Sequence, residues 1–272
     1  MSFRHIGQCV LLWLGGFCAF SCSVKEDRSD CPCFLTLDLR EVPVAVPEEA
    51  FPVRWHLTQG AWSDTGLLSK EDCEAGVFHV AMPRGGAQVY AVTGDEGQFD
   101  EGLEIEPGHG CPPVRLWTAA IDARGENAQA TVRLRKMYCR LTIRLTGTPA
   151  SRPYRFVLEG GVSGYDTSGY PVPGFFRCRP DPSPGQAGKT DWTACLPRQR
   201  DDSLLLHICD LNAGEETPPL RTFALGHIIA AAGYDWTAPD LEDLTLDLDF
   251  AASTLTLGTD RWTRTLSFEI IL

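Results

Sequence analysis

Residues 141–145 (LTIRL) and residues 244–250 (LTLDLDF) alternate strictly between apolar and polar side chains. Successive side chains of a β-strand point to opposite faces of its sheet, so this alternation is typical of a strand with one buried face. Further strand-like runs occur at residues 35–39, 53–57, 77–81, 89–92, 132–135, 255–257 and 266–270, and several of them alternate in the same way. Turn-rich loops separate the runs, and the chain contains 26 Gly and 19 Pro. Repeated short strands with such loops predict an all-β protein built of β-sandwiches.

One segment has the period of a helix. Apolar residues recur there at i, i+3, i+4 and i+7, namely Leu225, Ile228, Ile229 and Ala232. Gly233 follows them and can end a helix in the left-handed conformation. Residues 171–188 are rich in Pro and Gly, so we expect a surface loop there.

Length and charge limit the architecture and the partners. The chain has 272 residues, of which 43% are hydrophobic, enough for two domains with their own cores. An acidic, glycine-rich half ends near Ala130, so we expect one domain at residues 33–130 and another at residues 131–272. The formal net charge of -12 argues against nucleic acid as a partner, because binding phosphates requires a basic surface.

The first 22 residues have the pattern of a bacterial lipoprotein signal. Arg4 and His5 precede an apolar run at residues 9–20, which is too short to span a bilayer. The run ends in residues 19–22 (AFSC), where small residues precede a cysteine that a lipoprotein signal peptidase could select. Cys22 would then carry a diacylglycerol on its sulfur and an acyl chain such as palmitate on its amine, and several chains hold a protein on a membrane. The alternative is an ordinary cleaved signal followed by a disulfide cysteine.

The segment after Cys22 is polar. Residues 23–30 (SVKEDRSD) have no apolar period and predict a solvated tether, so residues 22–32 form a lipidated tether after a signal peptide at residues 1–21. Ser23, and not Asp, follows the lipidated cysteine, so no retention signal for the inner membrane is evident. Residues 25–27 (KED) resemble an acidic signal for export to the outer surface. We therefore expect a surface-exposed outer-membrane lipoprotein; the alternative is a simple charged linker.

The cysteines leave two structural states open. Eight of the 11 remain once the leader and Cys22 are set aside: Cys31, Cys33, Cys73, Cys111, Cys139, Cys178, Cys195 and Cys209. An even number in an exported protein permits disulfides, although their connectivity cannot be read from sequence. Several lie within strand-like runs and could be buried thiols. No pair has the spacing of a zinc site, so we expect no metal.

Motifs for catalysis are absent from the sequence. Residues 161–165 (GVSGY) end in Tyr where a nucleophile elbow has Gly. Residues 95–101 (DEGQFDE) lack the alternating Asp and Asn of a calcium loop and are expected to form a solvated turn. The histidines of the mature chain are scattered, at His56, His79, His109, His207 and His227. We expect no enzymatic activity and no cofactor. Trp192 and Tyr170 could stack on sugars, but core or loop-anchoring roles are more common for such residues.

Both ends of the chain carry a family resemblance. Residues 22–33 (CSVKEDRSDCPC), followed at once by a Leu-Thr-Leu-Asp-Leu strand, resemble the start of the FimB-like fimbrial anchor lipoproteins of type V pili. Residues 223–229 (FALGHII), 233–236 (GYDW) and 241–246 (LEDLTL) are similar to the last third of that family, as is Trp262 before a final strand. Within this region we expect Tyr234 and Trp236 to pin the helix onto a sheet, and Asp235 to bond nearby backbone groups.

The resemblance implies both a fold and a role. Members have two transthyretin-like β-sandwich domains in tandem, sit in the outer membrane by their lipid, and anchor a fimbrial shaft while limiting its length. Shaft subunits join by complementation, in which a strand from one subunit fills a groove in the next. The resemblance thus implies fimbrial shaft subunits as partners, and Cys22 as the one residue with a transferable role. The alternatives are a surface lipoprotein that binds glycans or host proteins, and a secreted hydrolase, which would need converging catalytic groups.

Overall fold

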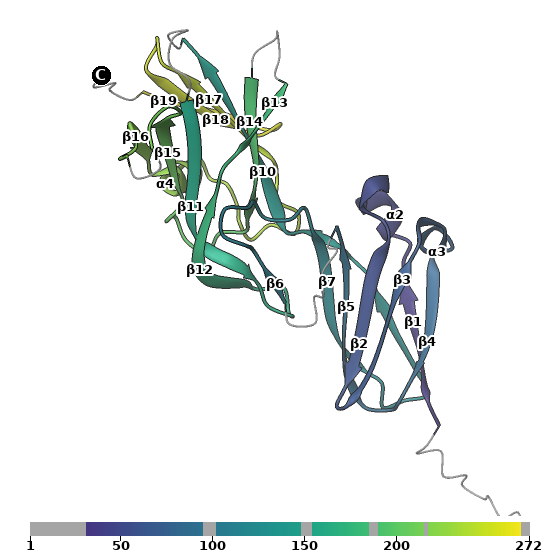
Figure 1. The fold of residues 1–272 in the computed structure, drawn as a ribbon. Helices are drawn as coiled ribbons and strands as arrows, with labels where there is room; N and C mark the ends of the chain where they lie inside the picture. Colours follow the sequence, from purple (N-terminus) through teal and green to yellow (C-terminus); the bar gives the residue numbers. More distant parts are fainter. Residues whose placement is uncertain (1–30, 95–101, 148–153, 185–189, 215–216, 268–272) are drawn as a thin grey trace, which may run out of the picture.

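A computed structural model describes residues 31–94, 102–147, 154–184, 190–214 and 217–267. Within these residues the chain forms two β-sandwiches in succession, each made of two sheets (Figure 1). Each sandwich has its own cluster of buried apolar side chains. The expected all-β fold with two tandem transthyretin-like sandwiches is therefore confirmed. The boundary near Ala130 stays a prediction.

The first sandwich contains a three-stranded and a five-stranded sheet. The smaller sheet has the order β4-β1-β8, with β1 at Cys33–Asp38, β4 at Val77–Met82 and β8 at Asn127–Thr131. The larger has the order β3-β2-β5-β7-β9, with β2 at Val53–Gln59, β3 at Trp62–Leu68, β5 at Gly86–Thr93, β7 at Arg115–Asp122 and β9 at Arg135–Lys136. Short helical segments lie at one end: α2 (Val42–Ala45), a 3₁₀ turn (Glu48–Ala50) and α3 (Lys70–Glu74).

Helix α3 begins with a signal that the hydrophobic pattern does not reveal. The Ser69 hydroxyl accepts a hydrogen bond from the Asp72 N–H at 3.1 Å, and the Asp72 carboxylate accepts one from the Ser69 N–H at 2.8 Å. This reciprocal capping box satisfies two N–H groups that a helix start otherwise leaves free. It defines a five-residue helix that turns the chain from β3 in one sheet to β4 in the other.

The second sandwich contains a six-stranded and a five-stranded sheet. The six-stranded sheet has the order β13-β14-β10-β17-β18-β19, with β10 at Tyr138–Thr146, β13 at Asp181–Pro184, β14 at Thr190–Pro197, β17 at Leu244–Asp249, β18 at Thr254–Gly258 and β19 at Thr263–Ser267. The facing sheet has the order β12-β11-β15-β16, with β6 also paired to β11; its bounds are β6 at Leu103–Glu104, β11 at Tyr154–Tyr165, β12 at Pro171–Cys178, β15 at Leu205–Asp210 and β16 at Arg221–Phe223.

The two runs with the clearest alternation are neighbours in space. β10 pairs with β17 in parallel, and Leu141 lies opposite Leu244. Parallel strands need a long crossover connection, and here the crossover contains helix α4 at Leu225–Ala231. Leu225 and Ile229 on this helix are fully buried. Gly233 follows with φ +81°, so the helix and its left-handed end are confirmed.

The prediction of a strand at residues 132–135 is wrong in most of its length. Burial does alternate there, because Val132 and Leu134 are buried while Arg133 is exposed. Only Arg135 belongs to a ladder, in β9, and Val132 donates its N–H to the carbonyl of Asp38, the last residue of β1. The alternation of apolar and polar residues predicts which side chains are buried. It does not predict strand pairing, because an extended segment can be buried on alternate residues without a partner strand.

The prediction of a surface loop at residues 171–188 is also wrong for its described part. Residues 171–178 form β12 and residues 181–184 form β13. Both strands lie at the edge of their sheets. Proline removes one N–H donor, which a strand paired on one side only can tolerate. Pro and Gly therefore mark edge strands here.

Burial predicts which leucines hold the second sandwich together. Leu246 in β17 is fully buried, so Leu246→Ala should lower the free energy of unfolding by about 2–5 kcal/mol because it leaves a cavity. Leu211 is 54% exposed, so Leu211→Ala should change the free energy of unfolding by roughly 0.5 kcal/mol or less. Urea denaturation followed by tryptophan fluorescence measures both. Equal losses would argue against this core.

Candidate functional site: sheet edges and the junction between the sandwiches

The proposed lipid site cannot be placed in the structure. Cys22 lies outside the described residues, as do the acidic turn at residues 95–101 and most of the tether. In the described part of the chain, no helix is both long enough and apolar enough to cross a bilayer. Lipid attachment at Cys22 therefore stays a prediction.

The histidines of the mature chain lie on different elements, with His56 on β2, His79 on β4, His207 on β15 and His227 on α4. His79 shares a hydrogen bond of 3.1 Å with Thr36 on the first sandwich. On the second, His227 lies 3.3 Å from the Asp202 carboxylate, and both side chains are more than half exposed. In the ranges that the structure describes, no group of three His, Cys, Asp or Glu side chains could hold a metal ion.

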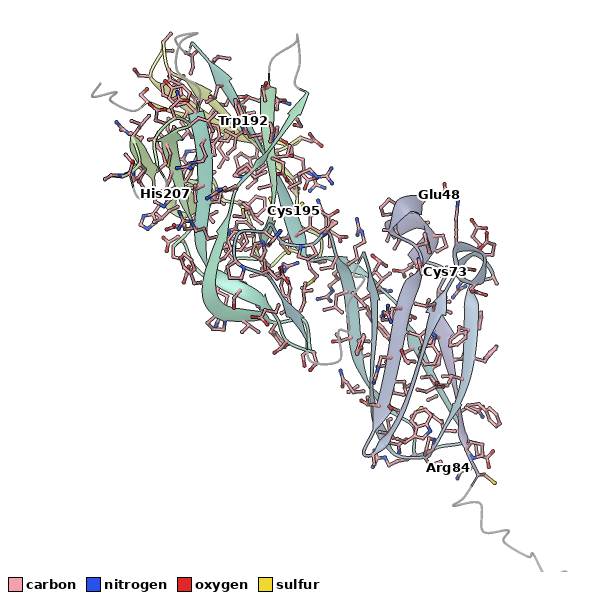
Figure 2. The ribbon with its side chains drawn as sticks, viewed as in Figure 1. Glu48, Cys73, Arg84, Trp192, Cys195 and His207 are labelled. Carbon is pink, nitrogen blue, oxygen red and sulfur yellow. The ribbon has the colours of Figure 1, made fainter. Side chains whose placement is uncertain are left out.

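Eight thiols lie in the described residues, and none is in a disulfide there. They occupy both sandwiches, as Cys73 on α3 and Cys195 on β14 show in Figure 2. Burial raises the pKa of the Cys139 and Cys178 thiols to about 12. Cysteines of this kind behave as small apolar core side chains and not as nucleophiles, since the thiolate is the reactive form.

Most sheet edges in the described residues are protected against a further strand. Prolines interrupt the edge strands β12 and β13. The edge strands β9 and β16 have only two and three residues. On β3, Asp64 lies opposite the buried Leu57 and so places a charge on the inner face of the edge. Prolines, short strands and inward charges are all devices that discourage edge pairing.

Strand β4 lacks these protective features. It has six residues (VFHVAM) and pairs on one side only, with β1. Its inward side chains Phe78 and Val80 are half-buried, although their cross-strand neighbours Leu37 and Leu35 are completely covered. Among the described residues, the other two unblocked edges offer less apolar surface, because β8 carries alanines and the described part of β19 carries one leucine. An added strand could complete the apolar surface beside β4.

The connection between β5 and β7 joins the two sandwiches. Its residues reach into the second sandwich, where the N–H groups of Ile105, Gly108 and Cys111 donate to the carbonyls of Ser163, Arg177 and Cys195, each at 2.8 Å. Ile105 and Cys111 are buried in the second core. The same core includes Tyr90 from β5 and Leu116 from β7. The first sandwich therefore supplies part of the second core.

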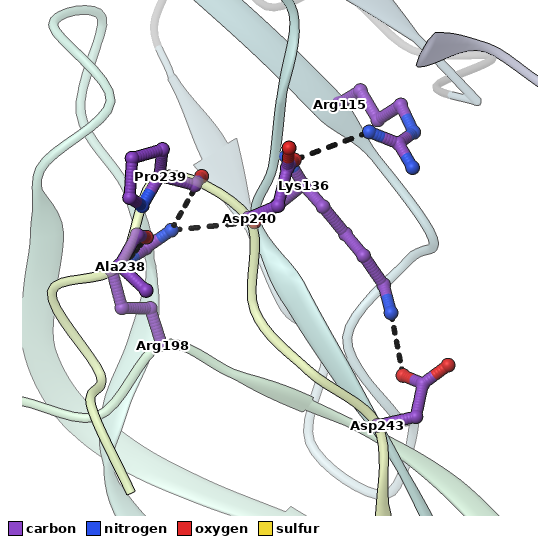
Figure 3. Close-up of polar contacts among 7 residues, drawn as sticks. All are labelled: Arg115, Lys136, Arg198, Ala238, Pro239, Asp240 and Asp243. Carbon is purple, nitrogen blue, oxygen red and sulfur yellow. Dashed lines mark hydrogen bonds and ion pairs between the residues drawn. The ribbon is translucent and has the colours of Figure 1, made fainter. Parts of the chain in front are cut away.

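Polar contacts close the same junction (Figure 3). Asp240 accepts a hydrogen bond from the Lys136 N–H at 2.6 Å and forms an ion pair of 3.2 Å with Arg115. The Lys136 ammonium lies 2.5 Å from the Asp243 carboxylate. The Arg198 guanidinium donates to backbone carbonyls, including that of Ala238 at 2.7 Å. These residues come from distant parts of the chain, so no local sequence signal marked them.

The aromatic residues singled out in the sequence have different roles. Trp192 packs edge-on against Phe156, with ring centroids 5.1 Å apart, and so anchors the core. Tyr234 donates its hydroxyl to the Glu242 carbonyl at 2.6 Å, and Asp235 accepts from the Thr237 N–H at 2.7 Å, which confirms the expected bonding of Asp235 to nearby backbone. Tyr170 differs from them, because it is 71% exposed.

Comparisons with known proteins identify the fold. No protein-family model matches the sequence, and no curated protein matches it. A candidate polysaccharide-binding protein from Bacteroides thetaiotaomicron has a TM-score of 0.62 at 10% identity, over 86% of this chain and 98% of its own. A candidate adhesin from Bacteroides ovatus has a TM-score of 0.59 at 12% identity, over 90% and 97%. The fimbrial anchor protein Mfa2 from Porphyromonas gingivalis has a TM-score of 0.57 at 12% identity, over 86% and 99%. The likeness establishes a shared two-sandwich fold.

Thiol reactivity tests the assignment of the buried cysteines. At pH 8 a thiol reagent should modify the exposed Cys31 rapidly in the folded mature chain. Cys139 and Cys178 should react slowly, because a pKa of about 12 leaves little thiolate. Cys31→Ser should remove the fast phase, and the denatured chain should expose all eight thiols beyond Cys22. A smaller number after denaturation would reveal a disulfide and contradict the free-thiol state.

Proposed function

We propose that this protein is an outer-membrane lipoprotein that anchors a fimbria or forms a minor subunit of it. A lipid on Cys22 holds the chain to the membrane, and the first sandwich accepts a strand from a shaft subunit. The observation that carries the proposal is the unprotected edge of β4 on a fold shared with a fimbrial anchor protein over 86% of this chain and 99% of that protein. The resemblance at both ends of the sequence supports the same role.

The β4 edge suits strand addition for two physical reasons. Its outer row of backbone N–H and C=O groups has no partner strand among the described residues, so an incoming strand gains main-chain hydrogen bonds. Phe78 and Val80 are half-buried, so alternate side chains of that strand gain apolar contacts. Main-chain bonds supply affinity and side-chain contacts supply specificity. This role requires no catalytic group.

The lipid claim is tested in intact cells. Labelling with a lipid precursor should mark the wild-type protein and not Cys22→Ala, and the variant should release shafts into the medium. Cys18→Ala is the matched control and should keep both lipid and shafts, because Cys22 is the predicted lipid site. Added protease should cleave the wild-type protein from outside. A lipidated Cys22→Ala variant, or a wild-type protein protected from protease, would be inconsistent with the proposal.

The edge claim is tested by a pair of charged substitutions. Val77 on β4 and Leu67 on β3 are both outward-facing and 44% and 57% exposed, so lysine at either should leave the fold intact. Val77→Lys should reduce the shafts retained on cells, because it places a charge beside the incoming strand. Leu67→Lys should not. Equal retention in the two variants would remove β4 as the acceptor.

A further inference from the structure

A cleft of about 650 Å³ opens at the junction of the two sandwiches. One wall comes from β7 and from residues 133–137. The opposite wall comes from three segments of the second sandwich, at residues 168–171, 198–200 and 236–238. Its volume lies in the range that holds small ligands. The β4 edge is not part of its lining, so this site is separate from the proposed strand acceptor.

The cleft is strongly basic in an acidic protein. Four arginines line it: Arg133, Arg135, Arg198 and Arg200. Among the described residues of the lining, none is Asp or Glu. The chain as a whole has a formal net charge of -12, so the positive charge of the cleft is opposite to the charge of the protein as a whole. Field lines that converge in a cleft of one sign favour a ligand of the opposite sign.

The arginines have little internal neutralisation. Arg135 and Arg200 are exposed. Arg200 interacts electrostatically with the carboxylate of the adjacent Asp201, which lies outside the lining, but among the described residues no salt bridge holds either guanidinium. Arg133 lies 3.1 Å from Glu41, but both side chains are more than half exposed, and such pairs contribute little. Arg198 is bound by backbone carbonyls, and within the ranges described it has no carboxylate in an ion pair.

Arg198 is the most deeply placed of these charges. Burial lowers the pKa of its guanidinium, and the positive charge of Arg135 lowers that pKa further, while Tyr165, Tyr234 and Asp235 oppose the shift. Arginine remains protonated throughout the physiological range. The cleft therefore keeps adjacent positive charges that an anion can neutralise, and guanidinium groups match a carboxylate with two parallel hydrogen bonds.

Aromatic rings accompany the charges. Trp117, Tyr170 and Trp236 all line the cleft. A tight turn holds Tyr170 in position, because the Asp166 carboxylate accepts from the Tyr170 N–H and the Asp166 N–H donates to the Tyr170 carbonyl, both at 2.9 Å. The preceding Gly169 has φ +80° and lies so close to Leu116 on β7 that a Cβ there would come within 2.8 Å of that side chain. The fold thus presents an exposed ring on a fixed turn.

We propose that this cleft binds an acidic oligosaccharide, that is, a chain of sugar rings bearing carboxylates. Each such ring offers a carboxylate to a guanidinium and a flat C–H face to an aromatic ring, so one unit engages both features of the lining. An acidic peptide would meet the arginines with flexible side chains, which lose more rotamer freedom on binding. Among the described residues, two edge strands reach the cleft. The two-residue β9 is too short to pair with a peptide backbone at length, and β12 begins there with Pro171, which has no N–H to donate.

Calorimetry on the full mature chain in low salt tests the proposal with tetragalacturonic acid as the probe. Maltotetraose is the neutral comparator, and tetraglutamate is the acidic peptide. We expect the uronic acid to bind, the neutral sugar not to bind, and the peptide to bind about tenfold more weakly or worse. Higher salt should weaken the interaction, because exposed charges are screened.

Variants connect the binding to the cleft. The double substitution Arg135→Gln with Arg200→Gln should weaken binding about tenfold or more, and Tyr170→Ala should weaken it to a similar extent. Arg124→Gln is the matched control outside the cleft, since Arg124 is a surface arginine paired with Asp122, and it should not change the affinity. Thermal melting confirms that each variant is folded.

Three results would overturn the proposal. The first is the absence of uronic acid binding at millimolar concentration. The second is an equal loss in the cleft variants and in Arg124→Gln, which would mean that general charge and not the cleft attracts the ligand. The third is equal or tighter binding of tetraglutamate, which would make the cleft a site for acidic peptides.

Discussion

The rest of the structure depends on the packing of one connection, the segment between β5 and β7, into the core of the second sandwich. The chain leaves β5, runs along the second sandwich and returns as β7, and backbone bonds from Ile105, Gly108 and Cys111 fix it there. Its apolar side chains belong to the second core, so separating the sandwiches would expose that core to water. The arginine-lined cleft depends on this contact, because each sandwich supplies one of its walls.

The alternating pattern predicted the strands well where one face of a sheet is buried and the other is exposed to solvent. It failed at residues 132–135, where the chain is extended and alternately buried but mostly unpaired. It also missed β12 and β13, whose prolines indicate a loop unless the strands are known to lie at an edge. The cleft could not be predicted, because residues as distant as Trp117, Tyr170 and Trp236 meet only after folding.

Both proposed sites are binding surfaces. The sheet edge and the cleft each lack something that a partner can supply. At β4 the missing element is a strand; in the cleft it is negative charge. The two proposed sites lie on different parts of the molecule, so a partner strand and an acidic glycan could bind independently.

Site-specific photo-crosslinking at Ala81 in living cells tests the central claim most directly. Ala81 is exposed on β4, so a photoreactive residue there should join the protein to a fimbrial shaft subunit, identified by mass spectrometry. The same photoreactive residue placed at Ser63 on β3, a protected edge strand, should give no crosslink to a shaft subunit. A shaft crosslink from Ser63 but not from Ala81, or none from either in cells that carry shafts, would contradict the account.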